Sequence, residues 1–91
     1  MGISAKKLER VIKGFANHRR LQIIEMLKDT PELSVEEIAE RLKTNYENTS
    51  DHIRKLAIAG LVLKRQEGTA VRHKITERAK AVLSFCKNLG I

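Results

Sequence analysis

The densest group of hydrogen-bonding side chains in the sequence lies between residues 45 and 55. Thr49, Ile53 and Leu56 recur at the spacing of one helix face, which predicts a helix over residues 46–59 with that face buried. The opposite face then carries charged groups at its centre and further polar groups beside them, namely Glu47, Asp51, Arg54, Asn48, Ser50 and Lys55. Such groups form hydrogen bonds and ion pairs, so the segment is suited to the recognition of a polar partner.

Groups that would support catalysis or metal binding are sparse. His18, His52 and His73 are too dispersed for a ligand cluster, and each is interpreted as a packed, capping or phosphate-facing histidine. The single cysteine, Cys86, excludes an internal disulfide and a multi-cysteine metal cluster within one chain. The sequence has neither a nucleophilic triad pattern nor a glycine-rich phosphate loop. We therefore expect no enzyme, no metal site and no cofactor.

The charge of the chain favours an anionic partner. There are 18 Lys and Arg residues against 11 Asp and Glu residues, a formal net charge of +7. Residues 1–20 carry six basic side chains and one acidic one, and residues 43–75 carry seven against three. Nucleic acid is the first candidate partner, with a charged surface that serves solubility alone as the alternative.

The chain length and its apolar segments limit the number of domains and the cellular location. A chain of 91 residues allows one domain. It has no apolar run of signal-peptide length and none near the roughly 20 residues that a membrane span needs. We expect a soluble, cytoplasmic, single-domain protein with no membrane partner.

Capping residues predict where the helices that position these groups begin. Ser4 can begin a helix over residues 4–16. Asn17 can begin a second helix, which should end near Asp29 because Pro31 cannot continue it.

The clearest helix start in the chain is the capping box formed by Ser34 and Glu37. A short turn follows this helix, and Asn45 is placed to cap the helix over residues 46–59. Two short helices joined by a three-residue turn predict a helix-turn-helix over residues 34–59.

The segment after Gly60 has the pattern of a two-stranded hairpin, a wing, over residues 61–75. In its second strand apolar positions alternate with Arg72 and Lys74, so one face can meet the core while the other carries charge outward. A last helix, capped by Thr76, is predicted over residues 76–89.

The terminal helices, residues 4–16 and 76–89, offer more apolar area than one small core is expected to use. Pairing with a second copy explains the surplus, and packing of the two helices on each other is the alternative. The expected dimer interface consists of Leu8, Val11, Ile12, Phe15, Val82, Phe85, Cys86 and Leu89. Cys86 is interpreted as a small buried apolar side chain, with a redox switch across the dimer as the alternative.

Two stretches of the chain resemble the ArsR family of winged-helix repressors. ANHRRLQIIEMLKD resembles the family's second-helix pattern, and the continuous stretch from LSVEEIAERL to VRHKI resembles its helix-turn-helix and wing. The resemblance covers residues 16–75, and the His52-Ile53 pair and the Ala59-Gly60-Leu61-Val62 exit into the wing are its specific parts.

This resemblance implies a fold and a function. The fold is a single-domain winged helix-turn-helix, mainly α with a small β-hairpin, in the order α-α-α-α-β-β-α. The function is sequence-specific binding of double-stranded DNA by a homodimeric transcriptional regulator, a repressor.

The resemblance also implies that residues 46–55 enter a major groove while the wing lies along the flanking backbone or minor groove. The helix residues expected to contact DNA are Asn45, Tyr46, Glu47, Asn48, Ser50, Asp51, Arg54 and Lys55. Among them Arg54 would bind guanine or a phosphate, Asn48 adenine, and the two carboxylates cytosine. The phosphate contacts of the wing would be Lys64, Arg65, Arg72 and Lys74.

Two carboxylates, Glu47 and Asp51, at the centre of a DNA-reading face depart from the basic or neutral character expected there. Pairing of Asp51 with Arg54 or Lys55 on its own helix is an equal alternative to a base contact. The same acids motivate a second hypothesis, a winged helix that binds another protein and has little affinity for DNA.

The metal-sensing sites known in the family are missing from the sequence. Ser34 and Glu36 stand where thiolate-sensing members carry cysteines. Residues 76–91 contain no histidine and one carboxylate, Glu77, so the ligand set of the terminal helix is missing as well.

Overall fold

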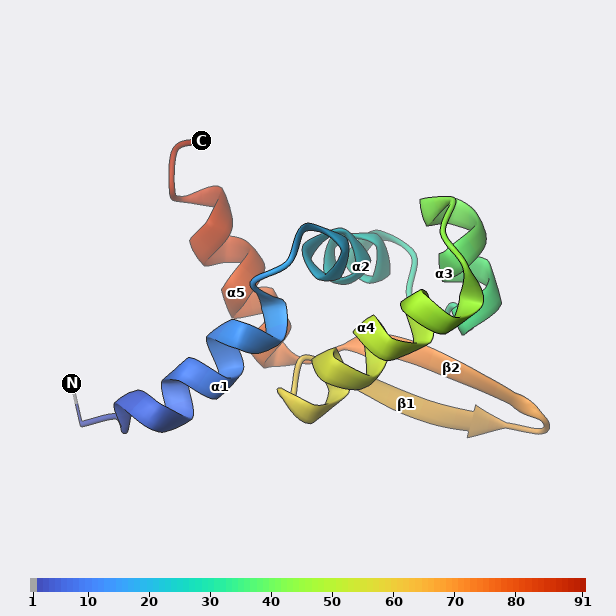
Figure 1. The fold of residues 1–91 in the computed structure, drawn as a ribbon, viewed down its shortest axis with the longest axis horizontal. Helices are drawn as coiled ribbons and strands as arrows, with labels where there is room; N and C mark the ends of the chain where they lie inside the picture. Colours follow the sequence, from blue (N-terminus) through green and yellow to red (C-terminus); the bar gives the residue numbers. More distant parts are fainter. Residues whose placement is uncertain (1) are drawn as a thin grey trace.

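The computed structural model describes residues 2–91 and contains five helices and one antiparallel hairpin (Figure 1). In chain order the elements are α1 (Ala5–Phe15), α2 (His18–Asp29), α3 (Val35–Leu42), α4 (Tyr46–Ile58), β1 (Val62–Glu67), β2 (Ala70–Ile75) and α5 (Glu77–Lys87). This is the predicted winged helix-turn-helix. The hairpin extends away from α1 and α5, beside α4, and the long dimension of the molecule, 43 Å, runs from the side of α1 to the hairpin tip.

The helices begin at the residues predicted to cap them. In each case a side-chain oxygen accepts a hydrogen bond from a backbone N–H of the first turn, and the capping residues are Ser4, Asn17, Ser34, Asn45 and Thr76. These bonds satisfy donors that have no partner within the helix.

The last helix is shorter than predicted. It ends at Lys87, so Leu89 lies beyond it, and the predicted extent of residues 76–89 was wrong at this end. The N–H of Leu89 bonds three residues back to Cys86, and Gly90 follows with a φ of +74°. Glycine in this left-handed conformation commonly terminates a helix.

The core lies where α2 and α4 cross. Ile23, Ile24 and Leu27 of α2 and Ile53 and Leu56 of α4 are at most 1% exposed. Side chains from the other elements complete this core, namely Leu33, Ile38, Leu61, Val62, Ile75, Ala79 and Val82. Burying only one face of α4 in this way leaves the opposite face exposed.

The turn between α3 and α4 is fixed by hydrogen bonds. Lys43 ends α3 in the left-handed conformation, with a φ of 56°. The hydroxyl of Thr49, which is 1% exposed, donates to the carbonyl oxygen of Asn45 at 2.8 Å and lies 3.1 Å from the hydroxyl of Thr44. The buried hydroxyl therefore holds the first turn of α4 against the preceding turn.

The base of the wing is joined to the loop before α3. The N–H of His73 donates to the carbonyl of Leu33 at 3.1 Å, and the N–H of Glu32 donates to the carbonyl of His73 at 2.7 Å. The imidazole of His73 is 1% exposed, and its Nδ1 lies 2.7 Å from the same Leu33 oxygen. The wing was predicted as a two-stranded hairpin, and this third strand-like segment was not foreseen.

Helix α1 lies unusually close to the end of α4. Gly14 is buried, and a Cβ atom built on it would lie 2.3 Å from the Cβ of Ala59. The glycine is therefore required by the close approach of two helices rather than by its backbone conformation.

We predict that Gly14→Ala lowers the free energy of unfolding by about 1–3 kcal/mol, because the added methyl group overlaps Ala59. The same change at an exposed helix position would raise stability by about 1 kcal/mol. Urea denaturation of both proteins measures the difference. A second substitution, Ala59→Gly, should restore part of the loss, whereas a Gly14→Ala protein at least as stable as the parent would contradict the close contact.

We also predict that stability falls as the pH drops from about 7.5 to about 5.5. Burial lowers the pKa of His73 below the ordinary value of 6.5, opposed by its bond to Leu33 and aided by the charge of Lys64. Burial also lowers the pKa of His52. As the pH falls through the pKa that these histidines have in the unfolded chain, the unfolded chain binds protons before the folded one does. The free energy of unfolding therefore decreases.

Denaturation at both pH values tests this prediction. The variant His52→Gln should keep the part of the decrease that comes from His73. A free energy of unfolding that is constant, or that rises on acidification, would contradict the burial of a neutral imidazole.

Candidate nucleic-acid interface

The exposed face of α4 presents the polar side chains singled out in the sequence. Glu47, Asn48, Arg54 and Lys55 are exposed, and Tyr46 is 52% exposed. Ser50 and Asp51 are half-buried. The face ends in an apolar side chain, Ile58, that is 75% exposed.

The N-terminus of α4 is capped by Asn45, whose Oδ1 accepts the N–H of Asn48 at 2.7 Å. This bond uses the acceptor of the Asn45 amide, and its NH2 group remains as the donor for a partner. The other N–H groups of the first turn have no partner four residues back, so this end of the helix is suited to a phosphate.

Asp51 lies between two basic side chains of its own helix. It accepts a hydrogen bond from Arg54, and its Oδ2 lies 3.1 Å from the Nζ of Lys55. Hydrogen bonds from Arg54 and Lys55 lower the pKa of Asp51 below its ordinary value, so the carboxylate is ionised at neutral pH. In the free protein Asp51 forms the ion pairs that the sequence allowed as an alternative to base contact.

The cations of the wing lie on two faces of the hairpin. Arg65 pairs directly with Arg72, and Leu63 with Lys74, which places Arg65, Arg72 and Lys74 on one face. Lys64 pairs with His73 and lies on the other face.

Acidic side chains neutralise part of the wing. Arg65 bonds to Glu32 and, at 2.7 Å, to Glu67, and these bonds raise the pKa of Arg65 further above its ordinary value. The hydrogen bond from Arg65 in turn lowers the pKa of Glu32. Two like charges directly opposite each other on a hairpin repel, so the acids also reduce the electrostatic repulsion between Arg65 and Arg72.

Glu37 joins the helix-turn-helix to the wing. Its Oε1 accepts the N–H of Ser34 at 2.9 Å, as the capping box predicts, and also the Nη1 of Arg72 at 3.1 Å. The bonds with Ser34 are the main cause of the lowered pKa of Glu37, and Arg72 adds to it. The sequence revealed the capping role, whereas the contact with Arg72, 35 positions away, carries no local signal.

Carboxylates therefore partner most of the cations expected to contact DNA. Arg54, Lys55, Arg65 and Arg72 each have such a partner. The acids Glu32, Glu37 and Glu67 were not predicted as part of the site.

The side chains expected at a dimer interface differ in exposure. Val82 is 9% exposed and belongs to the core of its own chain. Leu8, Val11, Phe15 and Cys86 are half-buried. Ile12, Phe85 and Leu89 are 43%, 58% and 51% exposed, so the surplus apolar area comes chiefly from these three.

Metal-binding clusters and membrane-spanning helices are both absent from residues 2–91. No group of three or more His, Cys, Asp or Glu side chains is arranged to hold a metal ion there. In the same range no helix combines the length and the apolar character that crossing a bilayer requires.

The comparisons with known proteins agree with this architecture. The model of the HVO_A0114 family matches residues 16–81. The transcriptional activator HlyU of Vibrio cholerae is 38% identical over 80 residues, which are 87% of this chain and 73% of HlyU.

Solved structures extend the likeness to nearly the whole chain. The homodimeric winged helix-turn-helix DNA-binding domain of Mb0332 from Mycobacterium bovis, described as a possible ArsR-family regulator, is 31% identical with a TM-score of 0.84. The match covers 99% of this chain and 89% of that domain. A structure of Vibrio cholerae HlyU is 36% identical with a TM-score of 0.82, over 98% of this chain and 97% of that one. The chain belongs to the HVO_A0114 family and is an ArsR-type winged helix-turn-helix transcriptional regulator.

Proposed function

We propose that the protein binds double-stranded DNA in a sequence-specific manner as a homodimer, with α4 in the major groove and the wing on the flanking backbone. The observation that carries this proposal is the exposed polar face of α4, which lies beside a cationic hairpin fixed to the same domain. The relatives named above are transcriptional regulators, and one is described as a DNA-binding domain.

The reading of bases is assigned to the exposed centre of α4. Arg54 has a side chain that is 57% exposed and can bind guanine through two hydrogen bonds. Asn48 is exposed six positions nearer the N-terminus and can pair with adenine. Asp51 lies between them in the chain and pairs with Arg54, so Arg54 must leave this carboxylate to contact a base.

Phosphates are assigned to the wing. Lys64 and Lys74 are exposed and form no ion pair within residues 2–91, so they can bind a phosphate without first breaking an ion pair. Arg65 and Arg72 must exchange a carboxylate for a phosphate. The carboxylates therefore weaken the sequence-independent part of DNA binding, which comes from phosphate contacts.

Dimerisation is assigned to the exposed apolar side chains of the chain ends, Ile12, Phe85 and Leu89. The Mycobacterium bovis relative is a homodimer. A two-fold dimer would present two α4 helices about 34 Å apart, one to each half of an inverted repeat. Occupancy of such a site represses or activates according to its position relative to a promoter, and the Vibrio cholerae relative is named an activator.

The proposal predicts binding to DNA from the gene's own upstream region with an affinity that falls steeply as salt rises. Fluorescence anisotropy across a salt series, with scrambled DNA as the reference, measures both properties, and the titration end point should give two protomers per site. Arg54→Ala should cost about 1–3 kcal/mol and relax the preference at one base pair. Lys28→Ala, on the exposed side of α2, is the control of equal charge change.

Equal and weak binding to both DNAs at all salt concentrations would contradict sequence reading. Retained binding to a protein partner in high salt, with no DNA affinity, would favour the winged helix as a protein-interaction module.

We further predict that Asp51→Asn strengthens binding to upstream and scrambled DNA alike, by roughly two- to tenfold, because it removes a negative charge from the DNA side and frees Arg54 and Lys55. The same titration measures the effect. Glu25→Gln, an exposed change of equal charge on α2, should leave both affinities unchanged. A loss confined to the upstream DNA would instead show that Asp51 accepts a hydrogen bond from a base.

A further inference from the structure

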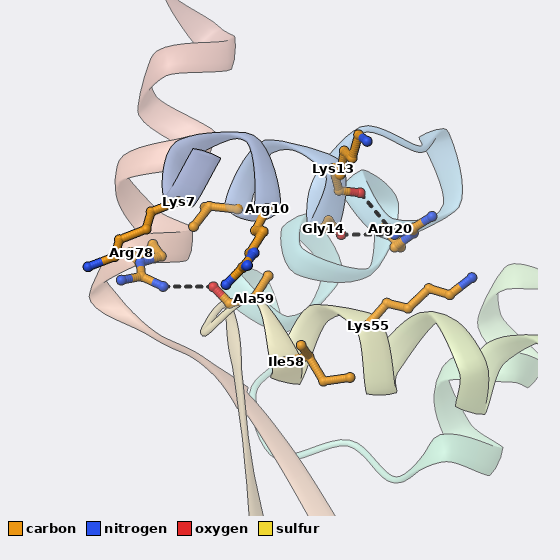
Figure 2. A pocket seen from close by; sticks show the side chains of 10 residues that line it. Lys7, Arg10, Lys13, Gly14, Arg20, Lys55, Ile58, Ala59 and Arg78 are labelled. Carbon is orange, nitrogen blue, oxygen red and sulfur yellow. Dashed lines mark hydrogen bonds between the residues drawn. The ribbon is translucent and has the colours of Figure 1, made fainter. Parts of the chain in front are cut away.

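An open groove of about 750 Å³ runs between α1, the C-terminal end of α4 and the start of α5 (Figure 2). We call it the α1–α4 groove. Of its ten lining residues six are Lys or Arg and none is acidic. Ligand sites usually have volumes of about 300–1,000 Å³, so the groove has room for a small molecule.

Within residues 2–91 four of these cations have no acidic partner, and one of the four, Arg20, donates instead to the backbone carbonyls of Lys13 and Gly14. Lys13 pairs with Glu9 at 3.3 Å, and Lys55 with Asp51. Within residues 2–91, ion pairs involve neither of the α1 cations Lys7 and Arg10 nor Arg78 of α5, and Figure 2 shows these three at one end of the groove. Three cations gathered without a counter-charge favour an anion between them.

Arg78 is held in place before any ligand binds. Its Nη1 donates to the carbonyl of Ala59 at 2.8 Å (Figure 2). The guanidinium also lies over Gly60, where a Cβ atom would be 2.6 Å from the same nitrogen. The side chain therefore loses little conformational freedom when an anion arrives, which favours binding.

The floor of the groove is apolar. It is formed by Val11, Gly14, Ala59 and Ile58, and the close Gly14–Ala59 contact leaves no long side chain to fill the space. Ile58 stays 75% exposed. A duplex backbone would satisfy the cations but would place charged phosphates against these apolar groups, whereas a ligand with a hydrocarbon part would cover them.

The groove shares Val11 with the dimer interface expected from the sequence, but it contains none of the three side chains assigned to the dimer above, Ile12, Phe85 and Leu89. Lys7, Arg10 and Gly14 lie on one face of α1. Ile12 lies on a different face of the same helix, so dimerisation through this side chain leaves the groove open.

We propose that the α1–α4 groove binds an organic anion with an extended apolar body, of which a medium-chain carboxylate is the simplest example. The carboxylate lies among Lys7, Arg10 and Arg78, and the hydrocarbon chain lies along Val11 and Ile58. The carboxylate then meets opposite charges, and the hydrocarbon chain meets apolar side chains.

The experiment uses the full chain, without DNA, and decanoate below its micelle-forming concentration. Two-dimensional amide NMR should show saturable shifts confined to the ends of α1, α4 and α5 that meet at the groove. Acetate lacks the chain and decyltrimethylammonium has the opposite charge, so both should bind at least about tenfold more weakly. Arg10→Glu should weaken decanoate binding by about tenfold or more.

Lys28→Glu is the matched control, because it makes the same charge change on an exposed face of α2 and should alter decanoate affinity less than about twofold. Ile58→Ser tests the apolar floor and should weaken decanoate binding without changing the binding of acetate. The NMR spectrum of each variant establishes that it is folded.

Four outcomes would overturn the proposal. They are the absence of saturable decanoate binding, shifts centred elsewhere on the chain, equal binding of decyltrimethylammonium, and equal effects of Arg10→Glu and Lys28→Glu. If Arg10→Glu weakened DNA binding but left decanoate binding intact, the groove would be assigned to the DNA backbone.

A consequence for regulation rests on the proposed DNA-binding function. Lys55 and Ile58 belong both to the groove and to the exposed face of α4. The bound ligand covers Ile58 with its hydrocarbon chain and adds a negative charge to the groove, so saturating decanoate should weaken DNA binding. Decanoate binding is measured without DNA, and its failure is therefore distinguishable from a failure of DNA binding.

Discussion

The pairing of Leu33 with His73 fixes the position of the wing, and the geometry of the proposed DNA-binding side depends on it. Two backbone hydrogen bonds and the imidazole of His73 join the base of the hairpin to the loop before α3. A two-stranded hairpin alone is marginally stable in water. The additional segment makes the hairpin part of the same rigid unit as the helix-turn-helix, so wing and reading helix approach a partner together.

The electrostatics of the protein differ from what its net charge suggests. A chain with a net charge of +7 would be expected to present unpaired cations to DNA. Cations of α4 and the wing instead form ion pairs with four carboxylates, those of Asp51, Glu32, Glu37 and Glu67. Exposed ion pairs of this kind add little stability. Their physical effect is on recognition, because any anion that approaches must compete with a carboxylate already in place, which penalises partners that offer charge alone.

The sequence was sufficient to predict most of the fold. Caps such as Ser34 and Asn45 act on the nearest backbone groups, so local patterns locate the helix starts. The end of α5 was missed because the apolar pattern continues through Leu89 while Gly90 turns the chain.

In the candidate site, too, local patterns predict what depends on neighbouring residues and miss what depends on distant ones. The polar face of α4 follows from helical periodicity, whereas the contacts of Glu32 with Arg65 and of Glu37 with Arg72 join residues 33 and 35 positions apart. The α1–α4 groove was also missed, since it depends on how two helices cross at Gly14.

The contact between Gly14 and Ala59 has a mechanical consequence for an assembled dimer. Helices normally slide past one another by adjusting the side chains between them. At Gly14 the backbone of α1 rests almost directly on Ala59 at the end of α4, with no longer side chain between them. A rotation of α1 within the proposed dimer would therefore act on α4 through this contact, and such a dimer should tolerate little variation in the number of base pairs between the two halves of its proposed DNA site.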